Sequence, residues 1–212
     1  VNMLSEEQHL VRESDLVLTS SEPLQEKWST KTERTLMLPN AADHGHFNGS
    51  AGPTSLADIS GPIIGYFGAI SEWFDVEMVR DAAMRRPNWQ FVLIGDTYGA
   101  EVTPLRALDN VHLLGERPYS ELPGYLARFD VACIPFLRTP LTNATNPVKF
   151  YEYLSAGKPV VAVELPELKP FSDFYYPVRE QLQFVPQVEV ALAECSDERR
   201  ASRIELAKNN TW

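Results

Sequence analysis

Short apolar runs alternate with amphipathic stretches through most of the chain, and this alternation decides the fold class. The runs cover residues 63–70, 91–94, 111–114, 131–137 and 160–163. Helical patterns lie between or after them, at residues 76–86, 103–108, 120–129, 147–156 and 167–174. Nearly continuous apolar strands that alternate with helices are typical of a parallel sheet covered on both faces. We therefore predict an α/β fold whose ligands bind at the carboxyl ends of the strands.

The first 47 residues carry a pattern of their own, with helices predicted at 5–14 and 22–28 and apolar runs at 16–18 and 35–38. Residues 48–61 are small and polar, with the glycine and proline breaks typical of a linker. We place a domain boundary there, so that residues 62–212 form the main domain and end in charged helices at 188–195 and 197–209. The chain starts and stops without clear signals, and we expect it to be part of a longer protein.

Composition excludes several classes of partner. The net charge is −10 at pH 7 and Lys and Arg form no cluster, so nucleic acid and anionic lipid surfaces are poor partners. No apolar stretch reaches the roughly 20 residues that a membrane-spanning helix needs. The two cysteines, Cys133 and Cys195, form no CxxC pair, and Cys133 lies inside an apolar run. We therefore expect a reduced, cytoplasmic protein.

The helix predicted at 147–156 has clear start and stop signals. Asn146 suits an N-cap, Pro147 suits the first helical position, and Gly157 followed by Pro159 ends the helix before a strand. The helix start then faces the loop after the 131–137 run. Its free N–H groups and positive dipole end predict a binding site for phosphate oxygens.

Two charged residues of this helix share one face. Lys149 and Glu152 lie, with Ala156, opposite the apolar face that is formed by Phe150, Tyr151 and Leu154. Such a pair suits a nucleoside diphosphate, because lysine offsets phosphate charge and a carboxylate can accept hydrogen bonds from ribose hydroxyls. The spacing alone equally allows an exposed i,i+3 ion pair worth only about 0.2–0.5 kcal/mol.

The run N-P-V-K-F-Y-E-Y-L-S-A-G-K-P-V-V at 146–161 resembles the donor-site helix of glycosyltransferases with the GT-B fold, of the GT4-like kind. In that resemblance Glu152 matches the ribose-binding glutamate. Residues 14–20 and 38–43 look like the closing elements of the N-terminal, acceptor-binding domain, and residues 65–68 look like the first strand and glycine turn of the donor domain. The resemblance implies a Rossmann-like sheet that forms the C-terminal half of a GT-B enzyme, with 1–47 as the end of its acceptor domain.

Two departures from the family pattern affect the site. Position 144, where the family carries a second glutamate, is Ala144, and no basic residue follows Gly68, which is succeeded by Ala69. We expect Lys149 to be the catalytic residue and to take over the phosphate contacts with the helix start. The predicted donor-binding residues are Glu152, Asn146, Thr145, Gly68, Ala69 and Arg117.

Several of these residues have a second interpretation. Gly68 could serve a simple turn, although we favour a glycine that lets the backbone approach the ligand. Arg117 could stack on a base, reach a phosphate or remain a solvated surface residue. Asp96 suits a turn or helix cap better than a ligand contact. His44 and His46 form an HxH pair, for which solvation or packing at the hinge is favoured over metal binding.

The resemblance implies transfer of a hexosyl group from a nucleoside diphosphate sugar to a glycan or lipid-linked acceptor, in cell-envelope or exopolysaccharide synthesis. It implies no metal and no cofactor, and the sequence contains no Asp-x-Asp motif. The acceptor would be held by the missing domain, where peripheral membrane association is compatible with the scheme, and this fragment alone should turn over nothing. Two alternatives stay open: a non-catalytic binding or assembly module, and a nucleotide-sugar epimerase, which needs acid/base residues in its N-terminal half.

Overall fold

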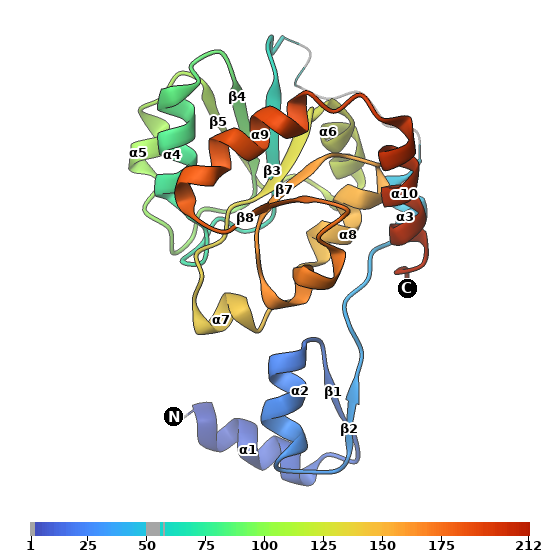
Figure 1. Ribbon diagram of the computed structural model, residues 1–212. Helices are drawn as coiled ribbons and strands as arrows, with labels where there is room; N and C mark the ends of the chain where they lie inside the picture. Colours follow the sequence, from blue (N-terminus) through green and yellow to red (C-terminus); the bar gives the residue numbers. More distant parts are fainter. Residues whose placement is uncertain (1–2, 50–55, 57) are drawn as a thin grey trace.

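A computed structural model describes residues 3–49, 56 and 58–212, and it contains a small unit and a large unit (Figure 1). The small unit, residues 3–38, comprises α1 (Met3–Glu13), β1 (Val17–Thr19), α2 (Glu22–Ser29) and β2 (Thr35–Met37). The large unit, residues 42–212, begins with the short helix α3 (His44–Phe47). The predicted linker 48–61 includes residues 50–55 and 57, which lie outside the described residues. The division into acceptor and donor domains stays a prediction.

The large unit is built on a six-stranded sheet with the order β5-β4-β3-β6-β7-β8, in which every neighbouring pair is parallel. The strands are β3 (Ile63–Phe67), β4 (Gln90–Ile94), β5 (Val111–Gly115), β6 (Val131–Ile134), β7 (Val160–Val163) and β8 (Tyr176–Val178). The first five lie within or beside the predicted apolar runs, so the predicted parallel α/β sheet is confirmed.

Helices cover both faces of this sheet. One face carries α4 (Val76–Arg85), α5 (Thr103–Arg106) and α9 (Phe184–Leu192), and the other carries α6 (Leu122–Arg128), α8 (Val148–Ser155) and α10 (Asp197–Lys208) (Figure 1). The remaining short elements are α7 (Pro140–Asn143) and the 3-10 helices η1 (Tyr119–Glu121), η2 (Pro166–Phe171) and η3 (Gln181–Gln183). Because both faces are covered, the strands are apolar throughout, and Cys133 is fully buried in β6 as predicted.

The strand order places a switch point beside β3. The chain runs outward from β3 through β4 to β5, then returns to the other side of β3 and runs through β6 and β7 to β8. Connections that leave neighbouring strands in opposite directions open a crevice at their carboxyl ends, where ligands of such sheets bind. The switch point lies between β3 and β6.

The segment between the units belongs to the packing of the large unit. Ala42 and Phe47 are buried in its hydrophobic core, although the sequence places them in the first domain. Thr211 near the C-terminus forms a parallel bridge with Ala42. The large unit therefore includes the last residues of the chain before the linker as well as the end of α10.

The small unit contacts the large unit through polar groups. Ser21 Oγ donates to the carbonyl oxygen of Ala144 over 2.8 Å, and the amide of Glu22 donates to the Glu167 carboxylate over 2.7 Å. Asn40, in the connection, donates to the carbonyl oxygen of Asn146 over 2.6 Å. These bonds fix the β1–α2 turn and the connection against the loop that precedes α8.

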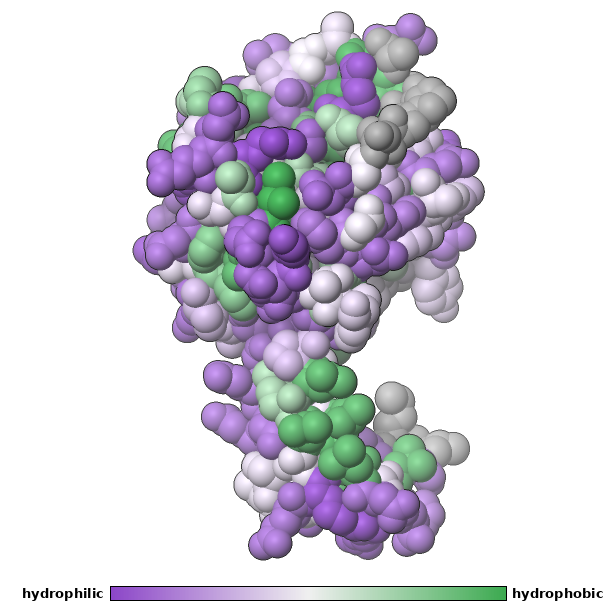
Figure 2. Space-filling model, turned by 90° about the vertical axis from the view of Figure 1, so that its right-hand side faces the viewer, coloured by the Kyte–Doolittle hydropathy of each residue, from purple (hydrophilic) through white to green (hydrophobic). Residues whose placement is uncertain are grey.

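One face of the small unit is apolar and exposed. Leu16, Leu18, Leu36 and Leu38 each have half or more of their surface exposed, and Leu18 and Leu36 are direct partners in the β1–β2 pair. Figure 2 shows hydrophobic side chains gathered on this unit, below the largely polar surface of the large unit. We call these four residues the leucine face.

Candidate functional site

A cavity of about 640 Å³ lies at the carboxyl ends of β3, β4 and β5, beside the start of α8. It is therefore at the switch point that the topology predicts for a ligand. Its wall comprises Phe67, Gly68, Ala69, Ile94, Gly95, Asp96, Glu116, Arg117, Pro118, Tyr119, Leu122, Val148, Lys149 and Glu152. The sequence analysis named Gly68, Ala69, Arg117, Lys149 and Glu152 as site residues, and the structure brings these five together.

Two glycines make the floor of this cavity. Gly68 has a φ of +127°, and a Cβ at this position would lie 2.9 Å from Cε of Lys149. Gly95 has a φ of +143°, and a Cβ there would lie 2.0 Å from the carbonyl oxygen of Gly68. Both positions combine a backbone conformation that disfavours side chains with a close neighbour. The missing side chain at Gly68 leaves room for the lysine as well as for the turn.

Lys149, on the first turn of α8, is half-buried, and its ammonium lies among aromatic rings. Its Nζ lies 5.2 Å from the ring centre of Tyr66 and 4.9 Å from that of Phe136. Within the described part of the chain, no carboxylate forms an ion pair with it at 4.0 Å or less. Burial lowers its pKa to about 8, and the charge of Glu152 opposes this change. The ammonium is thus held by aromatic faces and is open to an anion in the cavity.

Glu152 lies one turn further along α8, with 7% of its surface exposed. Its carboxylate accepts a long hydrogen bond of 3.5 Å from the hydroxyl of Tyr119. Burial raises the pKa of Glu152 to about 7, while Lys149, Tyr119 and His46 act to lower it. The exposed ion pair that the spacing also allows is not what the structure contains, because this carboxylate is buried in the cavity wall.

The start of α8 corrects one prediction. Pro147, not Asn146, is the N-cap, and the helix begins at Val148. The Asn146 side chain is buried and donates to the Glu167 carboxylate over 3.3 Å, while its Oδ1 has no hydrogen-bond partner among the described residues. The predicted cap was wrong: the Asn146 side chain lies toward the Glu167 carboxylate, and its Oδ1 accepts no hydrogen bond from the helix start.

Two predicted donor-binding residues lie outside the cavity wall. Asn146 faces Glu167, and the hydroxyl of Thr145 donates to the carbonyl oxygen of Leu141 over 2.9 Å. Both belong to the loop that leads into α8. The Thr145 hydroxyl and Nδ2 of Asn146 have partners within the fold, while Oδ1 of Asn146 has none among the described residues. Contact of either residue with a donor stays a prediction.

The remaining predicted residues have protein partners. Arg117 donates from Nε to the Tyr125 hydroxyl over 3.0 Å and from Nη1 to the carbonyl oxygen of Glu116 over 3.0 Å, so its guanidinium is held at the cavity rim. Asp96 accepts from the amide of Tyr98 over 3.2 Å, which confirms its turn role.

Of the HxH pair, His46 packs against aromatic rings of the large unit. His46 stacks on Tyr119 with ring centres 4.6 Å apart and contacts Phe47 edge-on at 4.9 Å. No group of three or more metal-ligating side chains gathers in the residues that the structure describes. Sequence reasoning missed Tyr119 as a wall residue, because nothing in the sequence places its ring against α3.

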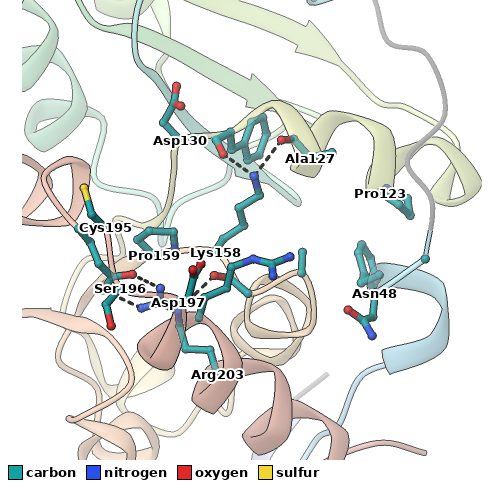
Figure 3. Close-up of a pocket in the computed structure, with 17 residues that line it drawn as sticks. Asn48, Pro123, Ala127, Asp130, Lys158, Pro159, Cys195, Ser196, Asp197 and Arg203 are labelled. Atoms are coloured by element: carbon teal, nitrogen blue, oxygen red, sulfur yellow. Dashed lines mark hydrogen bonds and ion pairs between the residues drawn. The ribbon is translucent and has the colours of Figure 1, made fainter.

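A second cavity, of about 520 Å³, opens at the amino ends of β6 and β7 (Figure 3). Lys158 points into this region, yet its ammonium donates to the carbonyl oxygens of Ala127 and Phe129 over 2.8 and 2.7 Å. Arg203, on the same wall, is paired with Glu194. Lys158 and Arg203 are therefore engaged in the fold, and the groups suited to a nucleotide lie in the cavity at the carboxyl ends.

Residues 61–184, more than half of the chain, match the family model described as "Glycosyl transferases group 1". The chain belongs to this family. The resemblance to GT4-like enzymes of the GT-B fold is thereby confirmed.

A curated relative agrees with the family. The chain is 26% identical over 223 residues to TuaH of Bacillus subtilis (strain 168), a proposed teichuronic acid biosynthesis glycosyltransferase, and the match covers 98% of this chain and 56% of the relative. The chain therefore spans little more than half the length of this relative.

Solved structures show the same fold. Sucrose-phosphate synthase of Thermosynechococcus elongatus matches with a TM-score of 0.74 and 19% identity, over 99% of this chain and 57% of that one. The N-terminal domain of Candida albicans trehalose-6-phosphate phosphatase gives a TM-score of 0.75 and 12% identity, over 100% and 58%. An Escherichia coli trehalose-6-phosphate structure bound with UDP-2-fluoro glucose gives 0.73 and 12%, over 99% and 60%.

The likeness falls in the C-terminal half of GT-B enzymes. The fold is thus the predicted Rossmann-like α/β fold. Within the described residues, no helix has both the length and the apolar character needed to cross a membrane.

Proposed function

We propose that this chain carries the donor site of a glycosyltransferase, in which the cavity beside α8 binds the nucleoside diphosphate part of a nucleotide sugar. One observation carries the proposal. A half-buried lysine and a buried carboxylate lie one helical turn apart, facing the same cavity at the carboxyl ends of a parallel sheet. A nucleoside diphosphate offers the complementary pair of groups, an anion and two vicinal hydroxyls.

Each group then has a role. Glu152 accepts hydrogen bonds from the ribose hydroxyls, and Lys149 binds the diphosphate together with the free N–H groups at the start of α8. Gly68 and Ala69 let the backbone approach the phosphates. Arg117 lies at the cavity rim, where it contacts the base or a phosphate of the donor. Asn146 and Thr145 position the loop before α8 and do not need to touch the donor.

Catalysis on this scheme rests on positioning and on stabilising the leaving group. As the bond between the sugar and the diphosphate breaks, negative charge grows on the diphosphate, and Lys149 with the dipole of α8 offsets it. Nothing in this scheme requires a metal ion.

Acceptor binding and transfer are proposed for the full-length enzyme, because the relatives are much longer than this chain. We propose transfer of a hexosyl group to a glycan or lipid-linked acceptor in the cytoplasm, with peripheral association of the enzyme with the membrane. Synthesis of a cell-envelope polysaccharide is supported by the assignment of the relative TuaH to teichuronic acid biosynthesis.

Calorimetric titration of this chain with UDP, GDP and ADP tests the proposal. UDP comes first, because a structure of the same fold holds UDP-2-fluoro glucose. We expect saturable binding of one nucleotide, and Glu152→Ala should weaken it by about 1–3 kcal/mol through the lost ribose contacts. Glu26→Ala, at an exposed position on α2, is the matched control and should leave binding unchanged.

The opposite outcome is equally clear. If a folded chain binds none of the three nucleotides at millimolar concentration, the donor site is refuted and a non-catalytic module becomes the better description. If binding occurs but Glu152→Ala has no effect, the nucleotide lies elsewhere.

A further inference from the structure

Two aromatic rings from distant parts of the sequence close over Glu152. His46, in α3, and Tyr119, in η1, stack with ring centres 4.6 Å apart and an angle of 11° between planes. Nε2 of His46 lies 3.0 Å from the carbonyl oxygen of Tyr119, and its N–H tautomer donates to it. Phe47 meets the Tyr119 ring edge-on at 5.6 Å. The tyrosine ring is thus held from two sides.

This held ring points its hydroxyl at the carboxylate. Tyr119 donates to Oε1 of Glu152 over 3.5 Å, although about half of the tyrosine is exposed and its ring lines the cavity. A carboxylate has about four acceptor positions, so one long bond leaves the others free for ribose hydroxyls. The tyrosine therefore restrains Glu152 without blocking it.

From this geometry we infer that Tyr119, fixed by its stack on His46, is a positioning residue that orients the Glu152 carboxylate toward the ribose of the donor. The inference rests on the proposed function, because it assigns these two residues a task in nucleoside binding. It also gives α3, at the start of the large unit, a direct link to the donor site.

The same contacts favour the charged form of the carboxylate. Burial disfavours the ionised form and raises the pKa of Glu152 to about 7, and three groups oppose this: Lys149 on α8, Tyr119 on η1 and His46 on α3. Burial, with the charges of Glu152 and of Asp43 before α3, raises the pKa of Tyr119 to about 12, so the hydroxyl stays protonated and donates. Glu116, Arg117 and Asp96 are the other charged residues on the cavity wall.

Removing either ring should therefore change the pKa of Glu152 in one direction. Without the Tyr119 hydroxyl or the His46 ring, the pKa of Glu152 rises further, and a larger fraction of the carboxyl is neutral at pH 7. Because a neutral carboxyl accepts ribose hydrogen bonds less well, binding should fall, and its fall toward acid pH should begin at a higher pH.

The test is calorimetric titration of the nucleoside diphosphates at several pH values, with wild type, Tyr119→Phe and His46→Gln. We expect both variants to bind about three- to tenfold more weakly at neutral pH. Their loss of affinity toward acid pH should begin at a higher pH than in the wild type. Tyr98→Phe and His9→Gln, both at exposed positions away from the cavity, serve as controls and should follow the wild type.

A second measurement does not depend on nucleotide. Carbon-13 NMR titration of the Glu152 carboxyl in the free protein should show a higher pKa in Tyr119→Phe than in wild type. The inference is overturned if this variant keeps the wild-type nucleotide affinity, if its affinity falls at the same acid pH, or if the pKa of Glu152 is unchanged. If wild type binds no nucleotide, the proposed function fails, and that result is distinct because the NMR titration still reads the Tyr119–Glu152 contact.

Discussion

Lys149 is a half-buried cation without a carboxylate within 4.0 Å among the described residues. Burial disfavours a charged amine, so its pKa falls to about 8. A bound diphosphate would supply the absent counter-charge and favour the protonated form again. The free energy of donor binding should then depend on the protonation of this one residue.

We therefore expect donor affinity to fall as the pH rises through about 8, since Lys149 is charged below this pKa and neutral above it. A nucleotide sugar is the preferred probe, because its phosphates are esterified and do not titrate in this range. Lys149→Arg should remove the alkaline fall, because arginine stays charged. The measurement is calorimetric affinity as a function of pH.

Lys158 provides a matched control for this prediction. Burial also lowers the pKa of Lys158 to about 8. This lysine lies at the amino ends of the strands, opposite the candidate site, and donates to backbone carbonyl groups. Lys158→Arg should keep the alkaline fall in affinity. If it removes the fall, or if Lys149→Arg retains it, the titrating group is not Lys149.

Because Gly68 has no side chain, the turn after β3 and the Lys149 side chain can pack closely against each other. Gly68→Ala places a methyl group 2.9 Å from Cε of Lys149, and the flexible lysine should move away and weaken donor binding about tenfold or more. Gly115→Ala should strain the backbone in the same way, because Gly115 has a φ of +69°, but the added Cβ would have no neighbour within 4 Å. Both should lose about 1–3 kcal/mol of stability in urea unfolding. Equal losses of affinity would show that the lysine contact is irrelevant.

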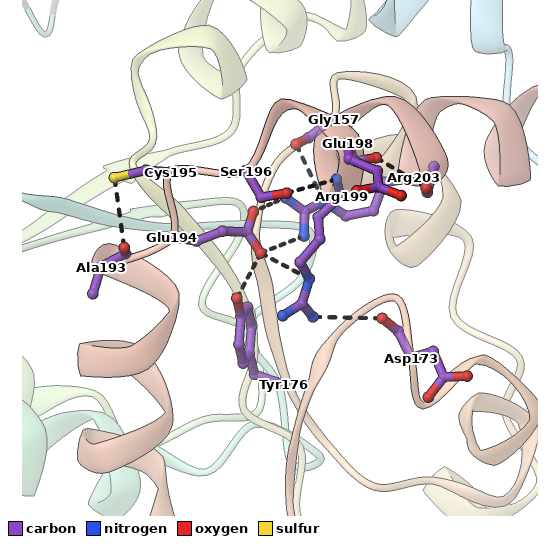
Figure 4. A network of polar contacts seen from close by, with 11 residues as sticks. Gly157, Asp173, Tyr176, Ala193, Glu194, Cys195, Ser196, Glu198, Arg199 and Arg203 are labelled. Carbon is purple, nitrogen blue, oxygen red and sulfur yellow. Dashed lines mark hydrogen bonds and ion pairs between the residues drawn. The ribbon is translucent and has the colours of Figure 1, made fainter.

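At the scale of elements, α10 is fastened to the large unit by a buried charge network (Figure 4). Arg203, with 1% of its surface exposed, pairs with Glu194 and donates to the carbonyl oxygen of Gly157 over 3.3 Å. The same carboxylate accepts from Tyr176 over 2.6 Å and pairs with Arg199 at 3.2 Å. Burial disfavours the charged Glu194, but these partners outweigh it and its pKa is lowered.

Arg203→Ala should destabilise the protein by about 3–5 kcal/mol, because it leaves a buried carboxylate without its main partner. Arg199→Ala removes a partly exposed arginine from the same carboxylate and should cost about 0–1 kcal/mol. Urea unfolding of both variants measures the difference. Similar losses would mean that the network is as weak as a surface pair.

How far the sequence predicted the elements depended on their length. Strands such as β4 and β7 were predicted because continuous apolar runs fill both faces of a covered sheet. The edge strand β8 was missed, since it has three residues with Pro177 at its centre, which only an edge position tolerates. The four-residue helix α7 left no periodic signal.

The candidate site was predictable where a local pattern sufficed. Lys149 and Glu152 share a helix face by spacing alone, and their place at the strand ends follows from the topology. The Asn146 side chain and the Tyr119 ring could not be placed, because Glu167 and His46, which hold them, come from distant segments. Contacts of this kind depend on tertiary packing.

At the scale of the whole molecule, the two units differ in how well their sheets are covered. The sheet of the large unit has helices on both faces, whereas the β1–β2 pair has α2 on one side and the leucine face on the other. Parallel strands are normally covered on both faces. About half of each leucine is exposed, so its full burial would gain about 0.8–1.5 kcal/mol, which favours association through this face.

We expect this chain to self-associate as its concentration rises, and Leu18→Thr with Leu36→Thr to keep it monomeric in sedimentation equilibrium. Threonine preserves strand propensity while it removes the apolar contact. Leu182→Thr, at an isolated exposed position in η3, should associate like the wild type. Because the net charge of −10 makes copies repel one another, added salt should strengthen association. Association that weakens with salt, or that survives the double substitution, would place the contact on charged surface rather than on the leucine face.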